Sequence, residues 1–433
     1  MGITRFLLAT CLAVAWVSSG SVVHAVQNET GIHYTVRKGD TLIKLSQIYL
    51  QRPDMYKVVQ QHNRIRNAHA IPVGTVLSIP RNLLKFKPGN ARLISVRGQV
   101  FVGEGRHAAN GLVLNEGVEL STSASSFATL QLDDGSRISL PSNSIIRIRR
   151  LRTYFLNNRL DYDFEVNKGG MRSTVTKQKS SEDRYQVRTP KAVSAVRGTD
   201  FQSRFDPLDQ KDFAEVVEGT LAVNTNSQPP EPLAAGNGLA VGANGSVVRE
   251  LMLSEPTLIE PAKLQADPQV RFQIAPTPGA VAYRLSIATD AGFVEQVADV
   301  VTHTANAEVN DVENGRLFAR VRAIAASGIE GKPATFAFRR RLNSVSASAG
   351  QGDEGYVFRW SGEGDGTRRY HFQLFRSTLE SVPMIDEASI DSDRVTISDL
   401  PSGEYFWRVG VVQYLDGETA TNWAPTEKMT IAD

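Results

Sequence analysis

The sequence predicts a mainly β, multidomain protein with one small helical unit near its N-terminus. Over most of 91–431, short runs of alternating apolar and polar residues are separated by Gly, Asn and Asp, which is typical of strands and tight turns. Only residues 42–63 show the spacing of amphipathic helices. The chain has 433 residues, a length that corresponds to about three domains.

Residues 1–25 have the features of a cleavable secretory signal. Arg5 precedes an apolar run at 6–17, and 23–25 supplies small and β-branched residues for cleavage. The run is short for a membrane anchor, and serines follow it. No other stretch approaches about 18 apolar residues. We therefore expect an exported, periplasmic protein whose mature chain has no transmembrane segment.

The composition excludes several classes of protein. Cys11 is the only cysteine, which excludes a disulfide framework and a thiolate metal cluster. The formal net charge is +2, so we expect no nucleic-acid partner. Residues 31–90 carry ten Lys/Arg and two Asp/Glu, whereas 350–433 carry seven and fifteen. The basic front favours an acidic polymer, or it consists of solvated helix faces.

Residues 32–80 have a β-α-α-β pattern. A strand at 33–36 leads through a Gly-Asp turn to a helix that starts at Thr41, with Asp40 and Thr41 as expected N-caps. The predicted buried stripe of this helix contains Leu42, Leu45, Ile48 and Tyr49. Pro53 opens a second helix, which Asn63 is expected to end in a left-handed conformation. A closing strand follows at 75–80.

The strings "HYTVRKGDTLIKLSQIYL", "NRI" and "AIPVGTVLSIP" resemble the LysM module over nearly the whole of this unit. The resemblance implies two helices on a two-stranded antiparallel sheet. It also implies binding of peptidoglycan or another N-acetylglucosamine-containing glycan in a shallow groove between two loops. Its expected contacts are Gly39, Asp40, Thr41, Leu42, Asn63, Ile65, Arg66, Ile71 and Pro72. Basic Arg64, Arg66 and His69 depart from the common LysM pattern.

Residues 81–90 are expected to form a basic linker, and 91–250 an all-β domain, either a β-roll or a sandwich. Within it, "ASSFATLQLDDGSRISLPSNS" and "YQVRTPKAVSAVRGTDFQSRF" resemble the FecR domain. That family includes transmembrane regulators, but no cytoplasmic segment or membrane helix is recognised here, so their signalling role is not carried over. Residues 226–234 are expected to be a Pro-rich loop before a final hairpin.

The FecR motif is expected to support the fold rather than bind a ligand. Its residues are Thr189, Pro190, Arg197, Gly198, Thr199 and Phe201. Gly198 suits a turn with positive φ, and Arg197 is expected to pair with Glu215 or Glu218. The nearby run of arginines at 147–152 is either a solvated strand face or a docking surface for an acidic partner.

Residues 266–342 and 350–431 read as two copies of one β-sandwich. "LPSGEYFWRV" in the second copy resembles the fibronectin type III or immunoglobulin-like group, with Tyr405 as a tyrosine corner. The first copy has Leu317 at that place. Trp360, Phe372 and Trp407 are expected in the core, whereas an exposed Trp423 would suit a sugar platform.

No catalytic constellation is recognised, since the histidines are scattered and neither HExxH nor GxSxG occurs. We therefore expect no enzyme activity, no catalytic residues, no metal site and no cofactor. The favoured function is a non-catalytic scaffold that binds peptidoglycan and presents its β domains to an envelope or inner-membrane protein. Two alternatives stay open: an extracytoplasmic sensor related to FecR regulators, and a peptidoglycan hydrolase or its accessory.

Overall fold

The computed structural model describes residues 31–225 and 228–432, and the predicted signal at 1–25 lies outside this range. The fold is mainly β, as predicted, with two α-helices in the described part of the chain. The chain divides into two units, of which the first ends at Lys85 and the second begins at Phe86. Each unit is described by itself.

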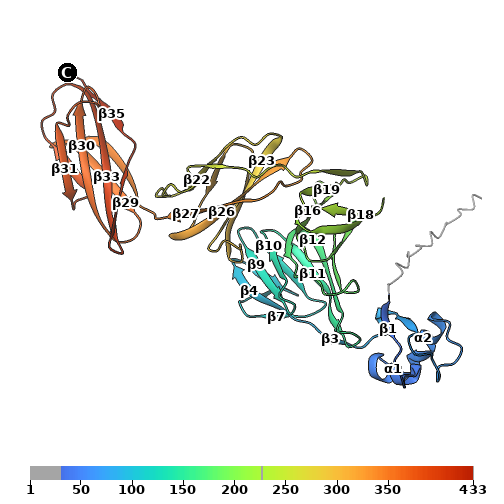
Figure 1. Ribbon diagram of the computed structural model, residues 1–433. Coiled ribbons are helices and arrows are strands. Elements are labelled where there is room, and N and C mark those ends of the chain that lie inside the picture. Colours follow the sequence, from blue (N-terminus) through green and yellow to red (C-terminus); the bar gives the residue numbers. More distant parts are fainter. Residues whose placement is uncertain (1–30, 226–227, 433) are drawn as a thin grey trace, which may run out of the picture. The chain divides into compact units, whose positions relative to one another are not determined.

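The first unit has the predicted β-α-α-β order (Figure 1). Its elements are β1 Ile32–Thr35, α1 Leu42–Tyr49, a 3-10 turn Pro53–Met55, α2 Tyr56–His62 and β2 Val76–Ile79. The two strands are antiparallel, with Ile32 opposite Ile79. Leu42, Leu45 and Val59 turn one face of each helix into the core, where burial of apolar side chains stabilises so small a unit.

The predicted buried stripe of α1 is wrong at Ile48, whose side chain is 57% exposed. At 100° per residue, a position six residues after Leu42 points away from the face that Leu42 defines, whereas Ser46 lies on it. Ser46 is fully buried, and its hydroxyl donates to the carbonyl oxygen of Pro53 at 2.7 Å. A polar residue therefore completes this face because it also holds the next turn.

Residues 81–85 are not the free linker expected from the sequence. They form a 3-10 turn, Arg81–Leu83, and then Leu84 pairs with Leu50 in a β-bridge. Leu84 is fully buried, and the Lys85 N–H donates to the Tyr49 carbonyl at 2.7 Å. The basic residues of this segment predicted an exposed linker, but Leu83 and Leu84 are buried and extend the core of the first unit.

The first part of the second unit consists of two hydrogen-bonded sheets that share strand β12 (Figure 1). One sheet runs β6-β5-β8-β11-β12-β13-β14-β17-β18, with β3 also beside β11. The other runs β7-β4-β9-β10-β12-β15-β16-β19-β20. Among the strand pairs of these two sheets that the structure describes, only β12–β13 is parallel.

The bounds of these strands follow the alternating runs of the sequence. They are β3 Phe86–Pro88, β4 Ala91–Arg97, β5 Val100–Val102, β6 Arg106–His107, β7 Val113–Leu114, β8 Glu119–Thr122, β9 Phe127–Leu132, β10 Arg137–Leu140, β11 Ile145–Tyr154, β12 Leu160–Thr174, β13 Arg184–Arg188, β14 Ala192–Val196, β15 Asp200–Asp206, β16 Lys211–Glu218, β17 Thr220–Thr225, β18 Gln228–Ala234, β19 Asn237–Val241 and β20 Val247–Leu251. The predicted final hairpin is present as β19–β20.

Strand β12 changes sheets at Gly169 and Gly170. Gly169 has φ +70, and a Cβ atom there would lie 2.6 Å from the Asn143 carbonyl oxygen. Only glycine fits this close approach at positive φ. The bend lets both halves of β12 contribute buried residues, Phe164 and Met171 among them, to one core.

The Pro-rich loop predicted at 226–234 is wrong for 228–234, which form β18, whereas 226–227 lie outside the described residues. This strand pairs with β17, with Thr220 opposite Ala234 and a register shift between Val223 and Thr225. Proline lacks an N–H and is tolerated where a strand needs no ladder bond from that position, as at a sheet edge.

Two sheets face each other after β20. The first has β21 Leu258–Ile259, β22 Val270–Ile274 and β25 Asn306–Val309, and the second has β23 Ala280–Ala288, β24 Gln296–Thr302, β26 Gly315–Ala325 and β27 Ala334–Arg340. Phe272 of one sheet and Phe338 of the other meet edge to face in the shared core, with ring centroids 5.0 Å apart. We call this arrangement the first two-sheet unit.

The second two-sheet unit repeats this plan with an aromatic core. Its strands are β28 Ser344–Gly352, β29 Gly355–Glu363 and β32 Arg394–Ile397 in one sheet, and β30 Thr367–Arg376, β31 Ile385–Ile390, β33 Gly403–Leu415, β34 Glu418–Trp423 and β35 Glu427–Ile431 in the other. Trp360, Phe372 and Trp407 are buried in the core, as predicted. The predicted tyrosine corner is confirmed, because the Tyr405 hydroxyl donates to the Pro401 carbonyl at 2.6 Å.

Candidate functional site

The two loops expected to form a groove lie side by side in the first unit. The Leu42 N–H, at the start of α1, donates to the carbonyl oxygen of Ala68 at 3.0 Å. This bond joins the loop before α1 to the loop after α2. A third segment meets them, since the Gly74 N–H donates to the Val36 carbonyl at 2.9 Å, directly before the first loop.

Asp40 holds the first loop in shape. Its carboxylate accepts from the Tyr34 hydroxyl at 2.8 Å and from the Arg37 N–H at 2.7 Å. Burial, together with the hydrogen bond and the charge of Asp40, raises the pKa of Tyr34 to about 12. Asp40 therefore closes the turn and is not a cap of α1. The predicted cap at Thr41 is confirmed, because its hydroxyl accepts from the Lys44 N–H at 3.2 Å.

The first loop offers mainly backbone to a ligand. Gly39 is exposed with φ +89, and a Cβ atom there would meet nothing within 4 Å. Its carbonyl oxygen accepts from the Lys44 ammonium at 3.1 Å. The Leu42 side chain lies in the core and is 2% exposed, so it is not available for the contact that the sequence predicted.

The second loop is braced from within and exposes polar groups. The Gln60 amide donates to the Ile65 carbonyl at 3.0 Å, and the Asn67 side chain accepts from the His69 N–H at 2.9 Å. Arg66 and His69 are exposed, whereas Ile65 is half-buried. The predicted contact Ile71 is buried, and the adjoining Pro72 is exposed.

Asn63 is placed to brace the fold. Its side-chain amide donates to the carbonyls of Val59 at 2.8 Å and Ser78 at 2.9 Å, and its oxygen accepts from the Ser78 N–H at 2.7 Å. These bonds tie the end of α2 to β2. The predicted left-handed conformation is wrong for Asn63, which has φ −98, and is found instead at Arg64, with φ 54.

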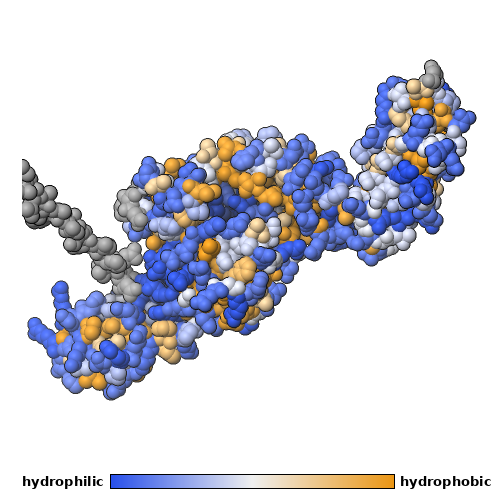
Figure 2. Space-filling view, turned by 180° about the vertical axis from the view of Figure 1, so that it is seen from behind, coloured by the Kyte–Doolittle hydropathy of each residue, from blue (hydrophilic) through white to orange (hydrophobic). Residues whose placement is uncertain are grey.

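Val73 is a further candidate contact that the sequence reasoning missed. It lies in the turn beside both loops, and its side chain is 67% exposed. An apolar residue at the tip of a Pro-Val-Gly turn has no core to enter, and that pattern was the available signal. Figure 2 shows apolar patches among hydrophilic residues on the surface of the first unit. Exposed backbone next to an apolar side chain suits an acetamido group, which has a donor, an acceptor and a methyl group.

The FecR motif residues make internal contacts. The Thr189 hydroxyl donates to the Ala192 carbonyl at 3.2 Å. Gly198 has φ +78 and lies so close to Lys177 that a Cβ atom would be 2.7 Å from the lysine Cα. Phe201 is fully buried, with its ring 6.4 Å from that of Tyr185. Pro190 lies in the turn between β13 and β14, and Thr199 is 3% exposed.

The expected pairing of Arg197 is wrong. Arg197 is exposed, and in the described part of the chain it forms no ion pair with Glu215 or Glu218. Glu215 instead accepts from the Arg204 guanidinium at 2.5 Å and from the Glu330 N–H at 3.2 Å. Its partners thus come partly from the first two-sheet unit, far along the chain.

The arginines at 147–152 face carboxylates. Arg147 and Arg149 are exposed while Ile146 and Ile148 are buried, as alternation predicts. Within this run, Arg149 lies 3.3 Å from Glu165 and Arg150 lies 3.0 Å from Asp163. Much of its positive charge is therefore neutralised by neighbouring β-strands, which favours a structural face over a docking surface.

Trp423 is not the open platform considered from the sequence. Its ring is half-buried and packs on Gly410, where a Cβ atom would lie 2.9 Å from the indole. The Arg408 guanidinium lies 4.5 Å from the ring centroid, and the His371 ring lies 4.9 Å away. Among the described residues, no group of three or more His, Cys, Asp or Glu is placed to hold a metal ion.

Two family models match the chain. The LysM domain matches residues 34–80, and the FecR protein family matches residues 118–222. The two resemblances found in the sequence are thereby confirmed. No curated protein matches. In the described part of the chain, no helix combines the length and apolar character needed to cross a bilayer.

Solved structures overlap with parts of the chain at low similarity. One, assigned as an anti-sigma factor from Parabacteroides distasonis, is 20% identical with a TM-score of 0.27, and the match covers 31% of this chain and 59% of that one. The chain thus spans less than two thirds of that protein. A segment of two fibronectin type III domains from chicken tenascin is 10% identical with a TM-score of 0.20, covering 42% of this chain and 99% of the segment.

Proposed function

We propose that this protein is a non-catalytic, periplasmic peptidoglycan-binding scaffold. The LysM domain holds an N-acetylglucosamine-containing strand of the cell wall, and the β domains that follow present surfaces to an envelope or inner-membrane protein. The observation that carries the proposal is the Leu42–Ala68 backbone bond, which brings the two loops of a matched LysM domain together.

The exposed groups of these loops fit a neutral amino sugar. Exposed Gly39 on one loop and exposed Asn67 and His69 on the other offer backbone polar atoms, and Val73 offers an apolar contact for an acetamido methyl group. Exposed Arg66 and His69 add hydrogen-bond donors that reach hydroxyl or carboxyl oxygens. No proton transfer or nucleophile is needed for this function.

A shallow site in so small a unit is expected to bind short sugars weakly, with a Kd between about 1 mM and 1 μM. Retention at the wall then depends on the repeating polymer. Each release is followed by rebinding to a neighbouring sugar at high effective concentration. Weak binding of a short oligomer and firm retention on intact wall are therefore compatible.

Titration calorimetry of the full chain with the β-1,4-linked tetramer of N-acetylglucosamine tests the site. Val73→Asp places a charge where the methyl group is expected, so its affinity should fall about tenfold or more. Val58→Asp is the matched control, because Val58 lies on α2 and is 49% exposed. It should bind within about twofold of the unaltered chain. Equal affinity of both variants would place the sugar elsewhere.

A further inference from the structure

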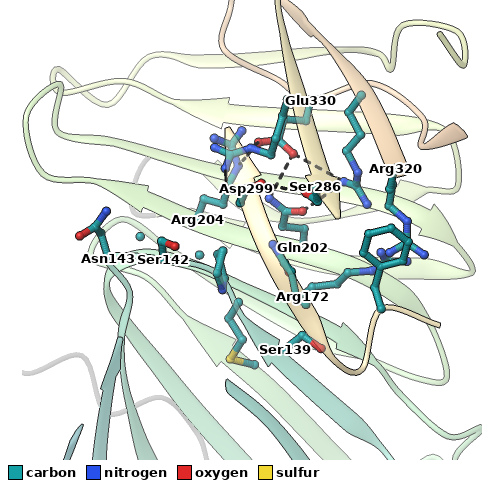
Figure 3. A pocket seen from close by; sticks show the side chains of 18 of the residues that line it. Ser139, Ser142, Asn143, Arg172, Gln202, Arg204, Ser286, Asp299, Arg320 and Glu330 are labelled. Carbon is teal, nitrogen blue, oxygen red and sulfur yellow. Dashed lines mark hydrogen bonds and ion pairs between the residues drawn. The ribbon is translucent and has the colours of Figure 1, made fainter. Parts of the chain in front are cut away.

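A cavity of about 420 Å³ lies between the FecR-like sheets and the first two-sheet unit (Figure 3). One wall comes from β10, β12 and β15, with Arg137, Arg172 and Arg204 among its residues. The other comes from β23, β26 and the loop before β24, with Arg320 and Phe293 among its residues. Both walls belong to the second unit of the chain.

Direct hydrogen bonds fix the two walls to each other. The Thr129 hydroxyl donates to the Val294 carbonyl at 2.7 Å on one side of the cavity. On another side, the Arg204 guanidinium donates to the Gly328 carbonyl at 2.8 Å. The space between the walls is therefore set by specific contacts, and its lining is defined.

The inner end of the cavity is balanced in charge. Three arginines, Arg204, Arg284 and Arg322, lie among three carboxylates, Glu215, Asp299 and Glu330. The Glu330 carboxylate lies 2.8 Å from Arg284, 3.6 Å from Arg204 and 3.7 Å from Arg322. Arg172 is likewise paired, with both of its bonds to Asp200. Because these arginines are already paired with carboxylates, they do not require an anionic ligand.

The outer part of the lining has an excess of positive charge. Arg137, Lys168 and Arg320 line the cavity, and within the described residues none of them forms an ion pair. Besides Asp299 and Glu330, the lining contains the carboxylate of Asp206, which accepts from the Leu208 and Asp209 N–H groups. The nearby Asp290 accepts from the backbone of Val294 and Glu295.

Arg320 is the cation at which the effect of this excess positive charge is seen. Its guanidinium lies 3.7 Å from the Phe293 ring centroid and donates to the Ala291 carbonyl and the Thr335 hydroxyl, both at 3.3 Å. Burial, and then the charges of Arg172 and Arg322, lower the pKa of Arg320 to about 9. A nearby anion would offset both effects, because it favours the charged form of the guanidinium.

The same lining contains apolar side chains and an unsatisfied hydroxyl. Met171, Phe205, Phe293 and Val294 line the cavity, and the first three are buried. The Ser142 hydroxyl, also in the lining, is buried without a hydrogen-bond partner in the described part of the chain. The site therefore offers both an apolar surface and free donors.

We propose that this cavity binds a small organic oxyanion, a carboxylate or phosphate carried on an apolar group. The anion lies toward Arg320 and Arg137, and the apolar group packs on Phe293 and Val294. Guanidinium groups bind either oxyanion through paired N–H donors. Because both walls take part, the ligand also strengthens the contact between the FecR-like domain and the first two-sheet unit.

Titration calorimetry of the full chain tests this site with four probes: hexanoate, its neutral analogue hexanamide, phenyl phosphate and inorganic phosphate. The proposal predicts binding of hexanoate or phenyl phosphate with a Kd of about 1 mM or tighter, and no binding of hexanamide. Hexanoate alone would identify a carboxylate ligand, and phenyl phosphate alone a phosphate. If inorganic phosphate binds equally well, the apolar part of the proposal is overturned. If none of the four probes binds, the whole proposal is overturned.

Arg320→Met is expected to lower the affinity for the anion about tenfold or more, because one charge-assisted contact is lost. Arg316→Met is the matched control, since Arg316 lies on the same strand, is exposed and does not line the cavity. It should leave the affinity within about twofold. Arg137→Met, at a half-buried position on the other wall, repeats the test if Arg320→Met does not fold. Unchanged affinity in a folded Arg320→Met or Arg137→Met variant would contradict the proposal.

Discussion

At the scale of single residues, several polar side chains complete hydrogen bonds that the backbone alone cannot make. Asn63 satisfies backbone groups of α2 and β2, and Tyr405 satisfies the carbonyl of Pro401. The Tyr405 corner could be predicted because its neighbours form a recognisable string. The role of Asn63 could not, since its partner Ser78 lies 15 residues away and the local pattern shows only a helix end.

Tyr405→Phe is expected to lower the unfolding free energy of the second two-sheet unit by about 1 to 2 kcal/mol, because the Pro401 carbonyl loses its partner. Among the described residues, the tryptophans are Trp360, Trp407 and Trp423, all in this unit, so their fluorescence in urea reports its unfolding. Tyr414→Phe is the control, since Tyr414 is 46% exposed. Identical urea midpoints for the two variants would disprove the contribution of the corner.

At the scale of elements, the alternation of apolar and polar residues predicted strands well. The runs at 127–132 and 137–140 coincide with β9 and β10. The method failed where composition and structure conflict. The prolines of β18 predicted a loop, although an edge strand tolerates residues that lack an N–H. The lysines near Leu84 predicted an exposed linker, although Leu84 is buried. The sharing of β12 between two sheets depends on contacts with Asn143 and Ser144, which a local pattern does not contain.

Gly169→Ala tests the bend in β12. The added methyl group would clash with the Asn143 carbonyl and the Ser144 residue, so we expect a loss of more than about 2 kcal/mol in unfolding free energy. Gly103→Ala is the control, because Gly103 also has positive φ, +61, but open space around it. It should cost only about 1 kcal/mol. Differential scanning calorimetry compares the two variants. Equal shifts in melting temperature would show that the bend in β12 accepts a side chain at position 169.

At the scale of the whole molecule, a buried charge network joins the FecR-like domain to the first two-sheet unit. Arg204 and Glu330 are 126 positions apart in the sequence, and no periodicity links them. The sequence therefore revealed the resemblances to LysM and FecR, which the family models confirm, but not the cavity between two β domains. Three arginines outweigh the effect of burial and hold the pKa of Glu330 well below its ordinary value.

Glu330→Gln is expected to reduce the unfolding free energy by about 3 kcal/mol or more, because it leaves buried arginines without their partner. The FecR-like domain and the first two-sheet unit should then melt in separate calorimetric transitions. Glu308→Gln serves as the control, since the Glu308–Arg271 pair is exposed at 53% and 57%. A single transition at an unchanged temperature in Glu330→Gln would show that the network does not couple the two.

We propose that the LysM domain attaches the molecule to peptidoglycan and that the β domains contribute no attachment of their own. Co-sedimentation with insoluble peptidoglycan tests it most directly, using the full chain and a chain that lacks residues 31–80. We predict that the full chain pellets and that the shortened chain stays in the supernatant. Equal pelleting of both chains, or failure of the full chain to pellet, would contradict the account.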